Sequence, residues 1–172
     1  MKTIVVKFGG TSLASAMGTF AGQNLGARKL DRVKLGLRRS AQIAVGMALI
    51  VALVLVLFGR PLLSLFINDE PELVEQVLTY GCRYLNVMSA GLFMLYLLFV
   101  YRSTLQGLGD TVIPMISGFV ELAMRIGCVT ILPMFLGEWG VYIAEISAWI
   151  GAGAFLMWGY YRRIHILEKE MG

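Results

Sequence analysis

Long apolar runs alternate with short polar segments along most of the chain. The first run covers residues 41–58 and the second covers 84–101, and neither contains a charged side chain. Two further runs, 111–136 and 139–161, contain three charged residues between them. A helix needs about 20 apolar residues to cross the hydrocarbon core of a bilayer. The pattern predicts an all-α integral membrane bundle of about four transmembrane helices, near residues 41–58, 82–104, 111–136 and 139–161.

The connectors between these runs differ in the sign of their charge. Segment 28–39 holds six cations and one acid, whereas segment 59–77 holds four acids and one cation. Short loops rich in Lys and Arg stay on the cytoplasmic side. If the chain crosses the membrane four times, starting in the cytoplasm, every connector lies on the side that its charge predicts. Both ends of the hydrophobic region are therefore expected in the cytoplasm. We therefore predict a multi-pass protein of the inner (cytoplasmic) membrane, with Arg28–Arg39 lying along its surface as an amphipathic helix.

Composition supports a lipid environment. Hydrophobic residues make up 58% of the 172 residues and charged ones 15%, compared with roughly 25% charged in soluble domains. The net charge of +4 comes from short clusters, which suit the lipid bilayer as partner better than nucleic acid. Cys82, Cys128 and His165 lack the paired spacing of a metal site, and no motif predicts a cofactor.

Charged residues within the apolar runs are the first candidates for function. Glu121 and Arg125 are four residues apart, so they share one helix face, and Glu145 lies in the last run. One interpretation is a structural ion pair between Glu121 and Arg125. The other makes Glu121 or Glu145 a carboxylate that lines a substrate or ion path. Asn86 and Gln106 could bind a ligand, but hydrogen bonds between helices explain them equally well.

Several short motifs, taken in order, resemble one transporter family. The segment at 22–29, GQNLGARK, is followed by a basic stretch, and the segment at 102–111, RSTLQGLGDT, leads into a proline. The segments 66–69 and 140–149 add two further landmarks. From about residue 16 onward the chain is similar to the C-terminal part of the multidrug and toxic compound extrusion (MATE) family. The motif residues are Gly22, Gln23, Asn24, Gly26, Ala27, Gly107, Gly109, Asp110 and Pro114.

This resemblance implies that the four spans correspond to the last four of the family's twelve helices. It also implies an antiporter, not an enzyme, which exports drugs or other organic cations in exchange for H+ or Na+. The N-terminal lobe and two helices of the second lobe have no counterpart here. We therefore expect a fragment, completed where it is active by a separate chain that carries the missing helices, and assign no coupling residue from the family.

The N-terminus has a different resemblance. Residues 2–14, KTIVVKFGGTSLA, are similar to the opening strand and phosphate loop of aspartokinases. The resemblance implies nucleotide-binding roles for Lys7, Gly9, Gly10, Thr11 and Ser12, and phosphorylation of aspartate by ATP as the alternative function. No α/β pattern follows to hold the substrates, so kinase activity is not expected. We interpret residues 1–15 as an N-terminal stub, from a fused or misassembled reading frame, and residues 16–172 as the membrane domain.

Overall fold

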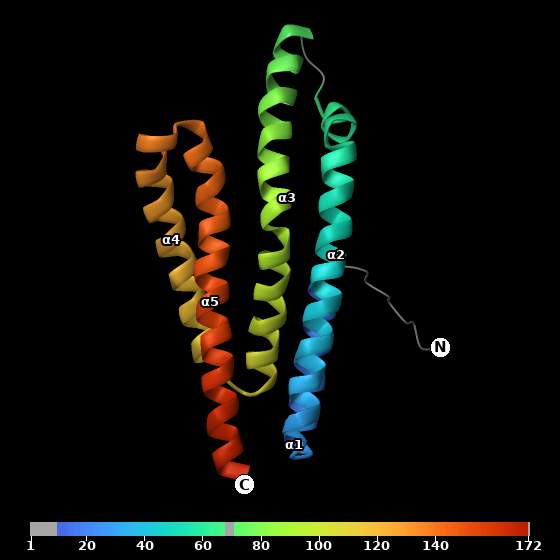
Figure 1. Cartoon of the computed structure of the whole chain (residues 1–172), viewed down its shortest axis with the longest axis vertical. Helices are drawn as coiled ribbons and strands as arrows, with labels where there is room; N and C mark the ends of the chain where they lie inside the picture. The colour runs from blue at the N-terminus through green and yellow to red at the C-terminus, as the bar shows by residue number, and fades with distance from the viewer. Residues whose placement is uncertain (1–9, 68–70, 172) are drawn as a thin grey trace, which may run out of the picture.

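The computed structural model describes residues 10–67 and 71–171, and these form an all-helical bundle (Figure 1). The described part of the chain contains no strand, which confirms the predicted fold class. The helices in chain order are α1 (Gly10–Gly26), α2 (Leu30–Ser64), α3 (Pro71–Gly107), α4 (Val112–Leu136) and α5 (Glu138–Met171).

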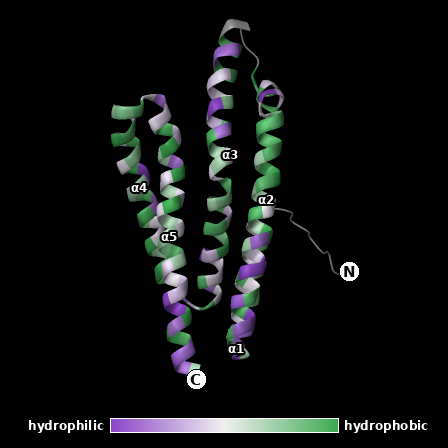
Figure 2. Ribbon diagram, viewed as in Figure 1, coloured by the Kyte–Doolittle hydropathy of each residue, from purple (hydrophilic) through white to green (hydrophobic). Residues whose placement is uncertain are grey.

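Helices α2 to α5 are long and apolar enough to cross a membrane. Each of the four predicted spans corresponds to one of them, and the α4 helix begins one residue later than predicted. Successive helices run antiparallel, so the start of α2 and the end of α5 lie at the same end of the bundle (Figure 1). Hydrophilic residues gather at that end, while the middle of the bundle is hydrophobic (Figure 2). This distribution agrees with a membrane setting.

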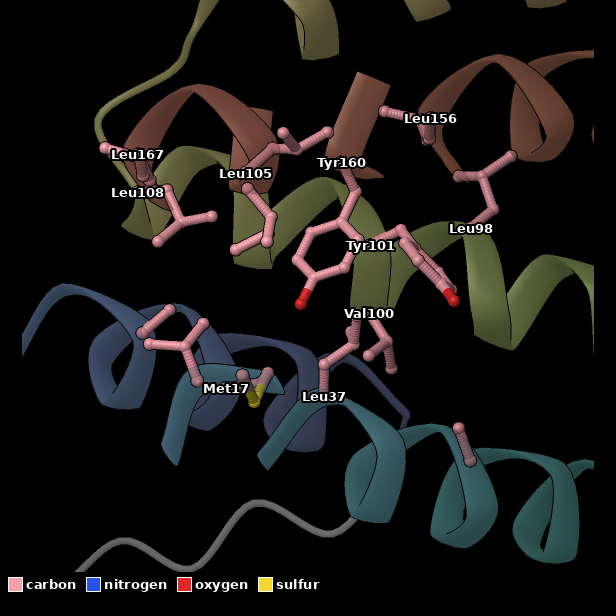
Figure 3. Close-up of a cluster of buried hydrophobic side chains, with 14 of the residues drawn as sticks. Met17, Leu37, Leu98, Val100, Tyr101, Leu105, Leu108, Leu156, Tyr160 and Leu167 are labelled. Atoms are coloured by element: carbon pink, nitrogen blue, oxygen red, sulfur yellow. The ribbon is translucent and has the colours of Figure 1, made fainter. Parts of the chain in front are cut away.

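The core lies where α1, α2, α3 and α5 meet (Figure 3). The cluster includes Met17 of α1, Leu37 of α2, Leu98 and Leu105 of α3, and Leu156 of α5, with Leu98 on the side of α3 that faces Leu156. Each of these five side chains is at most 4% exposed. The helices of this region are therefore fixed to one another by apolar packing.

Helices α1 and α3 approach closely through glycines. A Cβ atom at Gly18 would lie 2.9 Å from the Ser103 carbonyl oxygen, and one at Gly22 would lie 3.1 Å from the Gly107 carbonyl oxygen. A Cβ atom at Gly107 would collide with the Gly18 carbonyl group. Small residues allow this kind of backbone contact between helices in lipid. The contact holds α1 in the bundle.

Helix α1 was not predicted from the sequence pattern, and it changes the expected organisation. It begins at Gly10 and continues without a break to Gly26, so the predicted boundary between residues 15 and 16 falls inside a helix. Ala14 is 2% exposed and Met17 3% exposed, on either side of that boundary. Residues 10–15 thus belong to the same packed unit as the helices that follow.

Two details of α2 also differ from expectation. The basic segment does not form a separate surface helix, because residues 30–39 are the first turns of the same continuous helix as the span. At the other end, the helix does not stop where the predicted span ends at residue 58, since it extends to Ser64 with Pro61 inside it. At 35 residues and about 1.5 Å per residue, α2 is longer than the roughly 30 Å hydrocarbon layer.

Large apolar side chains cover the outside of α2 and α4. The most apolar 18-residue stretch of α2 is only 11% buried, and that of α4 is not buried at all. Leu49, Ile50 and Leu57 of α2 are each more than 60% exposed, as is Phe119 of α4. Such continuous apolar surface requires contact with lipid or with further protein.

Candidate functional site

Four charged side chains from three helices form one connected network. Glu121 of α4 is its centre: its Oε1 atom lies 3.1 Å from Arg125 Nη2, and its Oε2 atom lies 3.2 Å from Arg102 Nη2 of α3. Arg125 Nη2 also lies 3.1 Å from Glu145 Oε1 of α5. The predicted pair between Glu121 and Arg125 is confirmed, and Arg125 compensates both carboxylates.

A buried serine extends the network on the α3 side. Ser117 is fully buried, donates to the Pro114 carbonyl oxygen at 2.7 Å and lies 3.3 Å from Arg102 Nη2. Pro114 lies in the first turn of α4, where its missing N–H is not needed by the helix. This contact fixes Arg102 against the start of α4.

The network is only partly shielded. The side chains of Arg102, Glu121 and Glu145 are 25%, 22% and 26% exposed, and that of Arg125 is 43% exposed. The Nε atoms of Arg102 and Arg125 are buried and have no hydrogen-bond partner among the described residues. Two cations and two carboxylates balance, so the cluster has no net charge when all four are ionised. Buried N–H groups without a partner are able to donate a hydrogen bond to a bound water molecule or ligand.

This arrangement of carboxylates and guanidinium groups is suited to binding and releasing a proton rather than to covalent catalysis. Both carboxylate oxygens of Glu121 lie within ion-pair distance of an arginine. Protonating either carboxylate would weaken the contacts between α4 and its neighbours, because a neutral carboxyl group no longer attracts a guanidinium group. A carboxylate so placed could couple protonation to helix movement.

Arg102 is the member of the network that the sequence analysis missed. It directly follows the uncharged run 84–101, and the structure turns it toward Glu121 of α4. One sequence signal for this contact is that Arg102 and Glu121 lie on either side of the turn between α3 and α4. Arg102 precedes the turn at Gly109 by seven residues and Glu121 follows it by twelve, so their heights on the antiparallel helices differ by about 8 Å, a gap that the two long side chains span.

Asn86 and Gln106 lie away from this network. Both are exposed, and Asn86 lies 16 residues before Arg102 on α3, or about 24 Å along the helix axis. Asn86 lines a shallow groove of about 370 Å³ between α2 and α3, beside Ser89. Gln106 lies in the last turn of α3, where its carbonyl oxygen accepts a hydrogen bond from Gly109. The structure does not bring these two residues to the charged site.

The motif residues are explained by local structure. Asn24 donates to the Phe20 carbonyl oxygen at 2.8 Å near the end of α1, and Gly109 has a positive φ of 78° in the α3–α4 turn. Asp110 Oδ1 accepts hydrogen bonds from the backbone N–H groups of residues 112 and 113, at 3.1 and 3.0 Å. These contacts satisfy donors at the N-terminus of α4. The segment at 22–29 ends α1 at Gly26 and connects it to α2, and the Gln23 carbonyl oxygen accepts a hydrogen bond from the Ala27 backbone N–H group.

The kinase-like residues are only partly within the described chain. Lys7 and Gly9 lie outside it, whereas Gly10, Thr11 and Ser12 form the first turn of α1. A phosphate loop of the kinase type would leave a strand and stay non-helical at these glycines. The described chain starts at Gly10, so the nucleotide-binding roles remain predictions.

A cleft of about 970 Å³ lies between α2 and α5, with α3 as its floor. Three tyrosines line it, of which Tyr101 and Tyr160 meet edge to face with ring centroids 5.6 Å apart. At one end Lys34 of α2 forms an ion pair with Glu168 of α5. Hydrogen bonding to the Glu168 carboxylate raises the pKa of Lys34, and hydrogen bonding from Lys34 lowers the pKa of Glu168.

Comparison with known proteins identifies the family and the fold. The MatE family model matches residues 3–131. An inward-facing multidrug resistance MATE family transporter of the MOP superfamily superposes with a TM-score of 0.81 and 23% identity, covering 91% of this chain and 36% of that one. The outward-facing form gives a TM-score of 0.78 and 23% identity, with 91% and 35% coverage.

The MATE transporter VcmN of Vibrio cholerae, in its bent form, superposes with a TM-score of 0.75 and 21% identity, covering 92% of this chain and 39% of that one. The chain thus spans little more than a third of the length of these structures. No curated protein matches the sequence. The family match covers most of the chain, and the helices adopt the fold of part of a MATE transporter: the chain belongs to the MatE family.

Proposed function

We propose that this chain is part of a multidrug efflux transporter, which exports drugs or other organic cations across the cytoplasmic membrane by antiport with H+ or Na+. The observation that carries the proposal is the superposition of nine-tenths of the chain on MATE transporters in inward-facing and outward-facing forms. Transporters of this kind work by movement of two related lobes around a central site. Both ends of the hydrophobic region lie in the cytoplasm in this proposal.

The proposal includes a partner, because a bundle of this size matches only about a third of a complete transporter. We place the missing helices on a separate chain. The exposed apolar surfaces of α2 and α4 support this arrangement, since a partner helix would bury part of them. Alone, the chain is not expected to transport anything.

Within the assembly, we assign Glu121 and Glu145 to the ion path and Arg102 and Arg125 to its control. Two carboxylates share one guanidinium group, with 3.1 Å on each side. Protonation of one carboxylate would leave Arg125 paired with the other. Protonation thus gives the network two states, which differ by one unit of charge and in the ion pairs between helices, as a coupled transporter needs. The other interpretation is a structural ion pair with no role in transport.

The test is drug efflux from cells in which the chain and a candidate partner are produced together or separately. Export only from the pair, with both chains co-purifying, would support a split transporter. Efflux from the chain alone would contradict the proposed incompleteness. ATP binding by the purified chain, with no effect on efflux, would favour the kinase interpretation instead.

Variants of Glu145 separate the two interpretations of the charged network. In an active assembly, Glu145→Gln should reduce pH-dependent efflux at least tenfold while the assembled complex still purifies. The matched control is Glu138→Gln, which removes a carboxylate from the same helix where it pairs with Arg83 at 2.8 Å. Equal efflux by both variants would show that the network is structural.

A further inference from the structure

We propose that the cleft between α2 and α5 is a binding site for an anionic phospholipid, with the headgroup at its basic end and an acyl chain along its apolar end. This inference concerns a bound lipid, not the exported compound, and it does not depend on the proposed transport. It needs only the cleft and a bilayer around the helices.

The cleft has a gradient from charged to apolar. Lys34 and Arg38 of α2 and His165 of α5 line one end, while Ala41, Val45 and Leu97 line the other. From Lys34 to Val45 the cleft follows eleven residues of α2, or about 16 Å. An amphiphile that lies along the helices would therefore meet cations first and hydrocarbon afterwards. A phospholipid has this order of groups.

One cation at the basic end, Arg38, has no ion-pair partner among the described residues. Lys34 pairs with Glu168, and its Nζ atom also lies 3.8 Å from Asp31 Oδ1. Arg38 lines the cleft and has no carboxylate within ion-pair distance among the described residues. A guanidinium group is a strong donor to phosphate oxygens. Arg38 is thus the group that favours an anion over a zwitterion or an organic cation.

Tyr160 supplies a second, independent sign that the cleft is incomplete without a ligand. Its side chain is 3% exposed, and its buried hydroxyl group has no hydrogen-bond partner among the described residues. Figure 3 shows the hydroxyl oxygen pointing from α5 toward Leu37, another residue that lines the cleft. Buried hydroxyl groups in proteins are normally paired. A lipid phosphate or ester oxygen would accept this hydrogen bond.

The basic end of the cleft lies at the level of the chain where a lipid headgroup is expected. Lys34, Arg38, His165 and Glu168 lie outside the predicted spans, on the parts of α2 and α5 that continue beyond them. Figure 2 shows that these ends of the two helices are rich in hydrophilic residues. Basic pockets between helices at a membrane interface recognise anionic headgroups. The volume of about 970 Å³ is at the upper end of the range of ligand sites, roughly 300–1,000 Å³.

The experiment is native mass spectrometry of the purified chain with phosphatidylglycerol or phosphatidylcholine of identical acyl chains. We expect about tenfold preference for phosphatidylglycerol. Arg38→Gln should reduce its retention by about fivefold, the effect of one cation at a membrane surface. Arg39→Gln is the control, since Arg39 is the next residue on α2 and does not line the cleft. Tyr160→Phe should reduce retention by about threefold, as for one neutral hydrogen bond.

Four results would overturn the inference. The first is equal retention of the two lipids, and the second is an equal loss in Arg38→Gln and Arg39→Gln, which would indicate a general surface effect. The third is displacement of phosphatidylglycerol by excess inorganic phosphate, which would indicate a site for a soluble anion. Binding of a second copy without lipid would likewise show that protein fills the cleft.

Discussion

At the scale of single residues, the account depends on Glu121, whose two oxygen atoms contact arginines from the same helix and from α3. A partly buried ion network is not by itself a source of stability, because the charges lose hydration. Removing one member is nevertheless unfavourable, since its partners then lie in an apolar bundle without compensation. The network is therefore expected to be sensitive to single substitutions.

Glu121→Gln should lower the free energy of unfolding by about 2 kcal/mol, because Arg102 and Arg125 both lose an ionic partner. The measurement is denaturation of the purified chain in detergent. Glu75→Gln serves as control, because Glu75 forms an exposed ion pair with Arg60 at 2.7 Å and 59% exposure. Its loss should change stability by less than about 1 kcal/mol. Equal effects of the two variants would show that Glu121 is not the centre of the network.

The sequence predicted part of this site. Glu121 and Arg125 could be paired in advance, because helix periodicity alone places them on one face. Arg102 and Glu145 could not be assigned in the same way, since their contacts cross from one helix to another and depend on how the hairpins are rotated. Asn86 and Gln106 were considered on residue type alone, and the helix positions separate them from the charges.

At the scale of helices, glycine contacts and one ion pair fix the arrangement. Gly107→Ala should destabilise the bundle by about 1–3 kcal/mol, because the added methyl group meets the Gly18 carbonyl group of α1. Gly118→Ala is the matched control on α4, where a Cβ atom meets nothing within 4 Å. Because alanine has a higher helix propensity than glycine, this variant should be as stable as the parent chain or more stable by up to about 1 kcal/mol. Thermal unfolding in detergent distinguishes the two.

A stable Gly107→Ala variant would have to lose the contact between α1 and α3 while the other helices stay packed. Cross-linking between cysteines introduced by Ala14→Cys and Val100→Cys would reveal whether α1 has left its place. Full stability together with unchanged cross-linking would contradict the close approach of the two helices.

The ion pair between α2 and α5 should respond to pH. Glu168 has a lowered pKa, so its contribution is complete above its ordinary value of 4.5 and is lost as pH falls through the folded value. Lys34 has a raised pKa, so its contribution is complete below 10.5 and is lost as pH rises through the folded value. The ion pair should therefore persist at pH values between the folded-state pKa of Glu168 and that of Lys34.

Spin labels on Leu35→Cys and Ile166→Cys, in a background without Cys82 and Cys128, would measure this contact. The distance distribution between α2 and α5 should be narrow at pH 7 and broader at pH 3. The Lys34→Met variant should have a broad distance distribution at both pH values. An identical distribution at both values in the parent chain would show that the ion pair does not hold the helices together.

At the scale of the whole molecule, four of the five helices were evident from hydrophobic run length alone, because the bilayer sets that length. Helix α1 was not, since GTSLASAMGTFAGQNLG has many small residues and no long apolar run. Its place depends on Gly18 and Gly107, whose contact joins segments far apart in the chain. The continuation of α2 through residues 30–39 was also missed, because charge alone does not indicate where a helix leaves the membrane.

The match to complete transporters suggests what the bundle needs in order to act. Helices α2 and α4 present apolar faces that no described helix covers. Partner helices and lipid are the two environments able to cover them. Addition of the correct partner should therefore protect residues on one of these helices from lipid-soluble reagents, while the other remains accessible.

The most direct test of the account is the topology of the chain in cells. Single cysteines introduced by Asp31→Cys, Gln76→Cys and Lys169→Cys, in a background without Cys82 and Cys128, would be labelled with an impermeant maleimide. Four crossings predict that position 76 reacts in intact cells, and that positions 31 and 169 react only after the membrane is opened. Labelling of positions 31 and 169 from opposite sides, or recovery of the chain in the soluble fraction, would contradict the account.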